Sequence, residues 1–183
     1  MVSNGSVTLD SILANGNLQA ANIIAQGSVT LLGSLYTNQF NNSNGDSSSL
    51  YIRSTAGSVT LNKFTANNNN GGGVEVSSSG KLTIADAVTS LNRYEGVYGS
   101  SAGASITNLS ALNNGSGANG SGIHLILSSG TASFAKSSFA GNTGHGIWVE
   151  GSGYKPVVTI TSTTYYGNDT DRSGDKNFFV DQI

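Results

Sequence analysis

The chain has 183 residues, of which 10% are charged, with 25 glycines, one proline and no cysteine. This composition excludes a helix bundle with charged faces, and it leaves disulfides no part in stability. The formal net charge of −2 favours neither nucleic acid nor an anionic membrane as a partner, and no apolar run reaches the roughly 20 residues of a membrane span.

Seven short segments repeat an apolar, hydroxyl, apolar pattern along the chain. They are Val7-Thr8-Leu9, Val29-Thr30-Leu31, Val59-Thr60-Leu61, Leu82-Thr83-Ile84, Ala104-Ser105-Ile106, Ala132-Ser133-Phe134 and Val158-Thr159-Ile160. The alternation is typical of a strand with one buried and one wet face. Because the pattern recurs while the distance between copies varies, it predicts a stacked array of repeats.

An amide side chain follows each copy, eight residues past its last apolar residue. This series is Asn17, Gln39, Asn69, Asn92, Asn114, Asn142 and Asn168. The residues three and five positions past the same apolar residue are interpreted as inward-facing, although they mix apolar and polar side chains.

A second predicted strand follows each amide after a glycine-rich loop. Its inward pairs are Ile23 and Ala25, Leu50 and Ile52, Val74 and Val76, Val97 and Gly99, Ile123 and Leu125, Ile147 and Val149, and Phe178 and Val180. The residue between each pair must point outward. This outward series is Ile24, Tyr51, Glu75, Tyr98, His124, Trp148 and Phe179.

The outward series is rich in rings although aromatic residues make up only 8% of the chain. Its candidate binding residues are Tyr51, Tyr98, His124, Trp148 and Phe179. Two interpretations remain open. The rings form a face that holds sugar rings or a partner, or they only pack on one another between coils.

Copies such as GSVTLNKFTANNNNGGGVEV (57–76) and GHGIWVEGSG (144–153) give the chain a family resemblance. It resembles right-handed parallel β-helices of the pectin-lyase-like type and is similar to repeats of large bacterial surface proteins. The resemblance implies an all-β solenoid of about seven coils, with residues 1–183 as a single domain. It also implies that the amide series forms a ladder, that the protein is extracellular or on the bacterial cell surface, and that its partner is a polysaccharide or a cell-surface molecule. We expect a structural or adhesive protein and assign no catalytic residue.

A polysaccharide lyase or epimerase is the alternative function, because enzymes of this fold use clustered carboxylates with an Arg or Lys base. The stacked carboxylate pair in this sequence is Glu150 and Asp181. It fits either an active site or a solvated strand end.

A candidate calcium site and an ice-binding face are two further hypotheses. The calcium candidates are Asp169, Asp171 and Asp175, which resemble the first half of a calcium loop, but Val180 stands where such a loop needs a glutamate. A polar loop is the alternative, and no other cofactor is expected. The row of hydroxyls from Thr8 to Thr159 suggests ice binding, although β-propensity also explains it.

The two ends of the repeat array lead to a prediction of self-association. The array is expected to open at the strand that begins with Val7 and to close after Val180, with no capping helix at either end. Coils without caps expose backbone groups and apolar rows. We therefore expect either a segment of a longer solenoid or head-to-tail stacking of chains.

Overall fold

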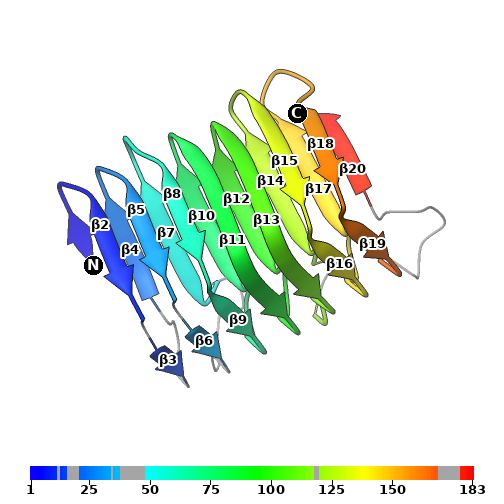
Figure 1. Ribbon diagram of the computed structural model, residues 1–183, viewed down its shortest axis with the longest axis horizontal. Helices are drawn as coiled ribbons and strands as arrows, with labels where there is room; N and C mark the ends of the chain where they lie inside the picture. The colour runs from blue at the N-terminus through cyan, green and yellow to red at the C-terminus, as the bar shows by residue number, and fades with distance from the viewer. Residues whose placement is uncertain (12, 16–20, 34, 38–47, 118–119, 169–177) are drawn as a thin grey trace.

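The computed structural model describes residues 1–11, 13–15, 21–33, 35–37, 48–117, 120–168 and 178–183. These residues form strands and no helix, and every strand pairing is parallel. Figure 1 shows the strands stacked side by side along a rod, from the N-terminal end to the C-terminal end. The expected all-β solenoid is confirmed.

The strands belong to two sheets. The eight-stranded sheet contains β1 (Val2–Ser3), β4 (Ala21–Ala25), β7 (Leu50–Ser54), β10 (Val74–Ser78), β12 (Val97–Ser101), β14 (Ile123–Leu127), β17 (Ile147–Gly151) and β20 (Phe178–Gln182). The main path of the twelve-stranded sheet contains β2 (Val7–Asp10), β5 (Val29–Leu32), β8 (Val59–Asn62), β11 (Lys81–Ser90), β13 (Gly103–Leu112), β15 (Thr131–Ala135) and β18 (Val157–Thr161). Its remaining strands are β3 (Leu13–Asn15), β6 (Leu35–Thr37), β9 (Thr65–Asn67), β16 (Ser138–Ala140) and β19 (Thr164–Tyr166).

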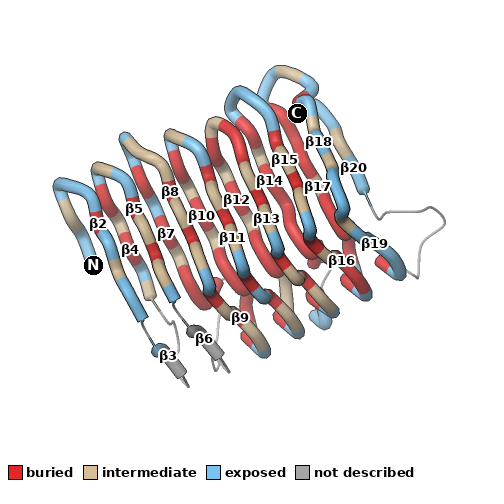
Figure 2. The backbone as a smooth tube through the Cα atoms, viewed as in Figure 1, coloured by how far each residue is buried: buried red, intermediate tan, exposed pale blue. Residues whose placement is uncertain are grey.

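The core lies between the sheets and consists of the predicted inward rows. Leu31, Leu61 and Ile84 have no exposed surface, and neither do Val74 and Ile147 on the opposite sheet. Figure 2 shows this buried line running through consecutive coils. Each inward side chain packs on its equivalent in the next coil, so stability comes from contacts between neighbouring coils.

The chain turns at two corner rows in which the backbone adopts positive φ. The non-glycine residues of the first row are Ser11, Lys63, Asp86, Asn108, Lys136 and Ser162, and those of the second are Asn68, Leu91 and Asn113. This conformation costs a residue other than glycine roughly 1–2 kcal/mol, which the stacked strands must offset. Asparagine and aspartate tolerate it best, which fits the Asn-rich turns of the sequence.

The amide row directly follows the second corner and forms a buried ladder. Each Nδ2 donates to Oδ1 of the next coil at 2.6 Å from Asn69 to Asn92, 2.9 Å from Asn92 to Asn114, 2.9 Å from Asn114 to Asn142 and 2.8 Å from Asn142 to Asn168. All five side chains are buried. Asn17 and Gln39 lie outside the described residues.

Two expectations about the first coils are wrong. The described chain does not open at the strand of Val7, because β1 precedes it and pairs with β4. Ile24 does not share a row with Tyr51, since Asn22 pairs with Tyr51 and Ile24 pairs with Arg53. A shift of two residues leaves the in-and-out alternation unchanged, so the sequence pattern could not detect it.

Candidate functional site

The outer surface of the eight-stranded sheet carries one continuous row of large side chains, which we call the outer row. It runs through neighbouring strands in register as Tyr51, Glu75, Tyr98, His124, Trp148 and Phe179. The parallel register brings residues that are more than twenty positions apart in sequence onto one face of the rod.

The C-terminal part of the outer row is a packed cluster of rings. His124 and Trp148 stack with centroids 4.0 Å apart and planes 6° apart, and Phe179 meets Trp148 edge to face at 6.1 Å. His145 contacts Trp148 at 4.9 Å and Phe179 at 5.1 Å. His124 and Trp148 cover each other's faces while Phe179 remains 39% exposed, and these ring contacts stabilise the packing between coils.

A buried contact between two polar side chains anchors this cluster. His124 Nε2 lies 3.0 Å from Glu150 Oε2, and both residues are buried. Glu150 also pairs in register with Asp181, as the sequence predicts, but the partners of the two carboxylates differ. Asp181 is exposed, and its Oδ1 accepts the backbone N–H of Gln182 at 2.8 Å. The geometry therefore gives Glu150 a partner in the aromatic cluster and leaves Asp181 solvated.

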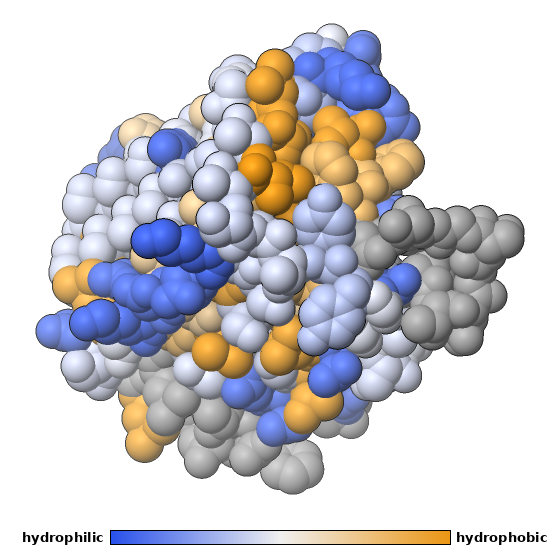
Figure 3. Space-filling view, turned by 45° about the vertical axis from the view of Figure 1, so that its right-hand side comes forward, coloured by the Kyte–Doolittle hydropathy of each residue, from blue (hydrophilic) through white to orange (hydrophobic). Residues whose placement is uncertain are grey.

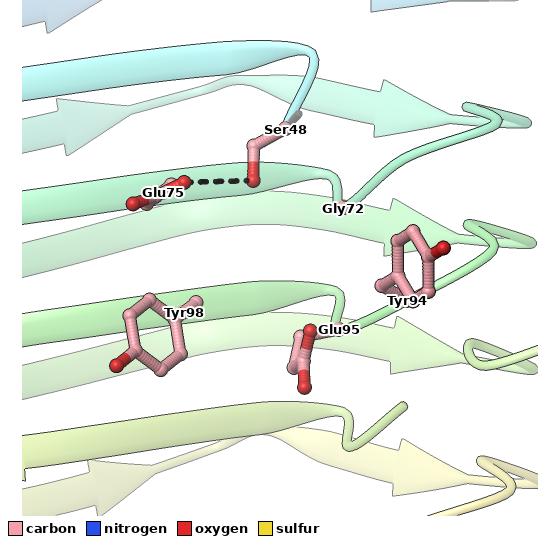
Figure 4. A pocket seen from close by; sticks show the side chains of 6 residues that line it. All are labelled: Ser48, Gly72, Glu75, Tyr94, Glu95 and Tyr98. Atoms are coloured by element: carbon pink, nitrogen blue, oxygen red, sulfur yellow. Dashed lines mark hydrogen bonds between the residues drawn. The ribbon is translucent and has the colours of Figure 1, made fainter. Parts of the chain in front are cut away.

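A pocket of about 280 Å³ opens beside the N-terminal part of the row. Its lining residues are Ser48, Gly72, Glu75, Tyr94, Glu95 and Tyr98. Glu75 and Tyr98 stand on β10 and β12, and the others come from the turns that precede β7, β10 and β12. In Figure 4, Glu95 lies between the two tyrosines, and Tyr98 is seen broadside below Glu75.

Tyr98 differs from the packed rings in how it meets its neighbour. Its plane is 80° from that of His124, with centroids 5.2 Å apart. In Figure 4 the Tyr98 ring is seen face on beside Glu75 and Glu95, and it is one of the residues that line the pocket. An aromatic face of this kind is what a sugar ring or a cation stacks on.

The pocket is acidic. Burial raises the pKa of Glu75 and the Glu95 carboxylate raises it further, although Ser48 Oγ donates a long hydrogen bond of 3.5 Å to Glu75 Oε2 that acts in the opposite direction. Burial also raises the pKa of Tyr98, and the carboxylates of Glu75, Glu95 and Glu150 add to that effect. The Tyr98 hydroxyl therefore stays neutral and available as a donor at physiological pH.

Strand alternation alone could not find this pocket. Glu75 was placed in the outward series, but Ser48, Tyr94 and Glu95 lie in turns, whose position relative to a strand has no sequence period. The only available signal was the sequence Tyr94-Glu95 shortly before a strand that carries an outward tyrosine.

Asp169, Asp171 and Asp175 lie outside the described residues. Among the residues that the structure does describe, no three acidic or histidine side chains are grouped as a metal site, and no helix is long and apolar enough to cross a membrane.

The hydroxyl row of the twelve-stranded sheet is in register from Thr8 to Thr159. The neighbouring serines are used for structure. Ser6 Oγ accepts the backbone N–H of Ser28, and Ser28 Oγ accepts that of Ser58, each at 3.2 Å. These hydroxyls hold adjacent coils together, so they do not form a second free row beside the threonines.

The family of this chain follows from the fold and from a match to a family model. The model described as "Right handed beta helix region" matches residues 48–174, and the chain belongs to that family. The expected right-handed β-helix is thereby confirmed, while the family description names no activity. No curated protein and no solved structure matches this chain.

Proposed function

We propose that this protein is a carbohydrate-binding β-solenoid that acts in adhesion outside the bacterial cell. The site is the pocket beside Tyr98. The observation that carries the proposal is the partly exposed ring of Tyr98 in a pocket whose lining also supplies two carboxylates and the Ser48 hydroxyl. Stacking on an aromatic face with hydroxyl groups bonded at the edge is how proteins hold a pyranose ring.

The size of the pocket supports one sugar residue rather than a long chain held end to end. Its volume of about 280 Å³ is near the lower limit of small-molecule sites, roughly 300 Å³. The outer surface of the sheet continues on both sides of the pocket, so a longer glycan can lie along the rod with one residue seated beside Tyr98.

The geometry favours binding over the lyase or epimerase alternative. Lyase chemistry on an acidic sugar needs a base and a positive group that neutralises the substrate carboxylate. The described lining residues supply the carboxylates Glu75 and Glu95 but no arginine or lysine, and without a cation these carboxylates repel an acidic sugar. His124 is committed to Glu150 and to the Trp148 stack.

A glycan array followed by titration calorimetry tests the proposal. The Tyr98→Ala variant should lose at least about tenfold in affinity for any glycan that the protein binds. Tyr166→Ala is the matched control, because this exposed tyrosine lies on β19 of the other sheet. Thermal melting of each variant shows whether it remains folded. Failure of every glycan to bind, or unchanged affinity in folded Tyr98→Ala, would overturn the proposed function.

A further inference from the structure

We infer that the pocket beside Tyr98 selects a cationic sugar, namely a hexosamine with a free ammonium group. This inference rests on the proposed sugar-binding function and names its ligand class. The charges in the pocket, the ring of Tyr98 and the positions of the nearby basic side chains support this ligand class.

The two pocket carboxylates have no cationic partner among the described residues. The contact between His124 and Glu150 lies farther along the row and involves neither pocket carboxylate. The arginine next to the pocket is engaged elsewhere, since Arg93 donates to Asn70 Oδ1 at 3.3 Å and its guanidinium lies 5.5 Å from the centroid of the Tyr94 ring. Glu75 and Glu95 therefore repel each other in a partly buried site.

A ligand ammonium placed between these carboxylates would relieve that repulsion. Tyr98 lines the same pocket, so the sugar ring that carries the ammonium group would have an aromatic ring to stack on. Charged hydrogen bonds from the ammonium to Glu75 and Glu95 would be stronger than those from a neutral hydroxyl. Two carboxylates that repel each other in a pocket are an arrangement found more often at functional sites than on structural surfaces.

The same charges exclude other glycans. Uronates and sulfated sugars bring an anion to two carboxylates, and an N-acetylated hexosamine carries no charge at the nitrogen.

A lysine side chain of a partner protein also carries an ammonium group. We favour the sugar because Tyr98 lines the same pocket as the carboxylates and can stack on the C–H face of a pyranose, and a rigid ring loses less conformational entropy on binding than a flexible lysine chain.

Three oligosaccharides that differ in charge test the inference by titration calorimetry. They are the hexamer of β-1,4-linked glucosamine, the corresponding N-acetylglucosamine hexamer and a galacturonate hexamer, each measured slightly below neutral pH, where the amine is protonated. We expect the free-amine hexamer to bind at least about tenfold tighter than the N-acetylated one, with a preference that weakens as salt is added. We expect no binding of the galacturonate.

Variants assign the preference to the pocket. Glu95→Gln should remove most of the preference for the free amine, whereas Asp181→Asn, an equal charge change on an exposed strand of the same sheet, should leave it intact. Equal affinity for the two hexosamine hexamers would overturn the cationic inference and leave the sugar-binding function standing. Binding of a lysine peptide with no binding of any oligosaccharide would overturn both.

Discussion

Replacement of Asn114 by leucine tests how much the buried amide ladder stabilises the solenoid. Asn114 Oδ1 accepts the backbone N–H and the side-chain N–H of Asn92 at 3.2 and 2.9 Å, and its Nδ2 also donates to the Thr89 carbonyl at 3.1 Å. Leucine is branched at the same carbon but makes none of these bonds. Asn114 Nδ2 also donates to Asn142 Oδ1 at 2.9 Å. Four buried groups would therefore lose a partner, and a group left with none costs about 1–3 kcal/mol. Burial of the apolar leucine offsets part of this, so we expect a net loss of about 2–4 kcal/mol.

Urea unfolding measures this loss. Asn22→Leu is the control, because Asn22 is exposed on β4 and its substitution should change the free energy of unfolding by less than about 0.5 kcal/mol. The Asn114 variant should also melt lower, by about 2–4 °C for each kcal/mol lost. Equal free energies of unfolding for the two variants would mean that the ladder hydrogen bonds are no stronger than the bonds the same groups make with water in the unfolded chain. That result would refute the stabilising role of the ladder.

Further predictions concern packing, charge and assembly. Gly96→Ala should lower the melting temperature strongly, because a Cβ at this position would lie 2.6 Å from the Gly122 carbonyl oxygen. Gly5→Ala is the control and should leave the melting temperature unchanged, because a Cβ at Gly5 would have no atom nearer than 4.0 Å. Trp148→Ala should lower the free energy of unfolding, because each lost ring contact is worth about 0.5–1.5 kcal/mol, and it should leave glycan affinity unchanged. A loss of glycan affinity with unchanged stability would make Trp148 part of the ligand site. The raised pKa of Glu75 means that the folded state favours the protonated carboxyl, so Glu75→Gln should raise the melting temperature near neutral pH. This gain should vanish as the pH falls below 4.5, the ordinary pKa of a glutamate. A gain in melting temperature that does not depend on pH would contradict the proposed charge repulsion. Apolar side chains are exposed on the last coil (Figure 3). We therefore predict that chains associate head to tail, so the mass measured by sedimentation should rise with protein concentration. A mass that stays at the monomer value would refute this prediction.

Most of the fold could be predicted from the sequence because a solenoid repeats one local rule. Val-Thr-Leu segments such as Val59–Leu61 place their apolar residues in the core, and the parallel pairing of Val59 with Leu82 follows from equal positions in successive copies. The buried Phe64 and Phe139 were placed inward correctly in the same way. Errors arose at the first coils, where β1 was missed and the strand with Ile24 was shifted by two residues.

The candidate site was less predictable because it depends on turns and on ring orientation. The pattern placed Tyr98 and Trp148 in one row, but it could not tell that Trp148 would stack on His124 while Tyr98 lies perpendicular to that ring. The pattern also gave no indication that Glu95, in the turn before β12, would line the same pocket as Glu75 on β10. Side-chain orientation on a sheet depends on neighbours in adjacent coils, which a single repeat does not specify.

Mapping of backbone amide chemical shifts by NMR during titration with the glucosamine hexamer tests the central claim most directly. The account predicts that the largest shifts cluster at β10, β12 and the turns before them, around Glu75, Glu95 and Tyr98. It also predicts that the amides of the outer threonine row on the twelve-stranded sheet stay unchanged. Shifts confined to that threonine row, or to the ring cluster around Trp148, would contradict the assignment of the binding site to this pocket.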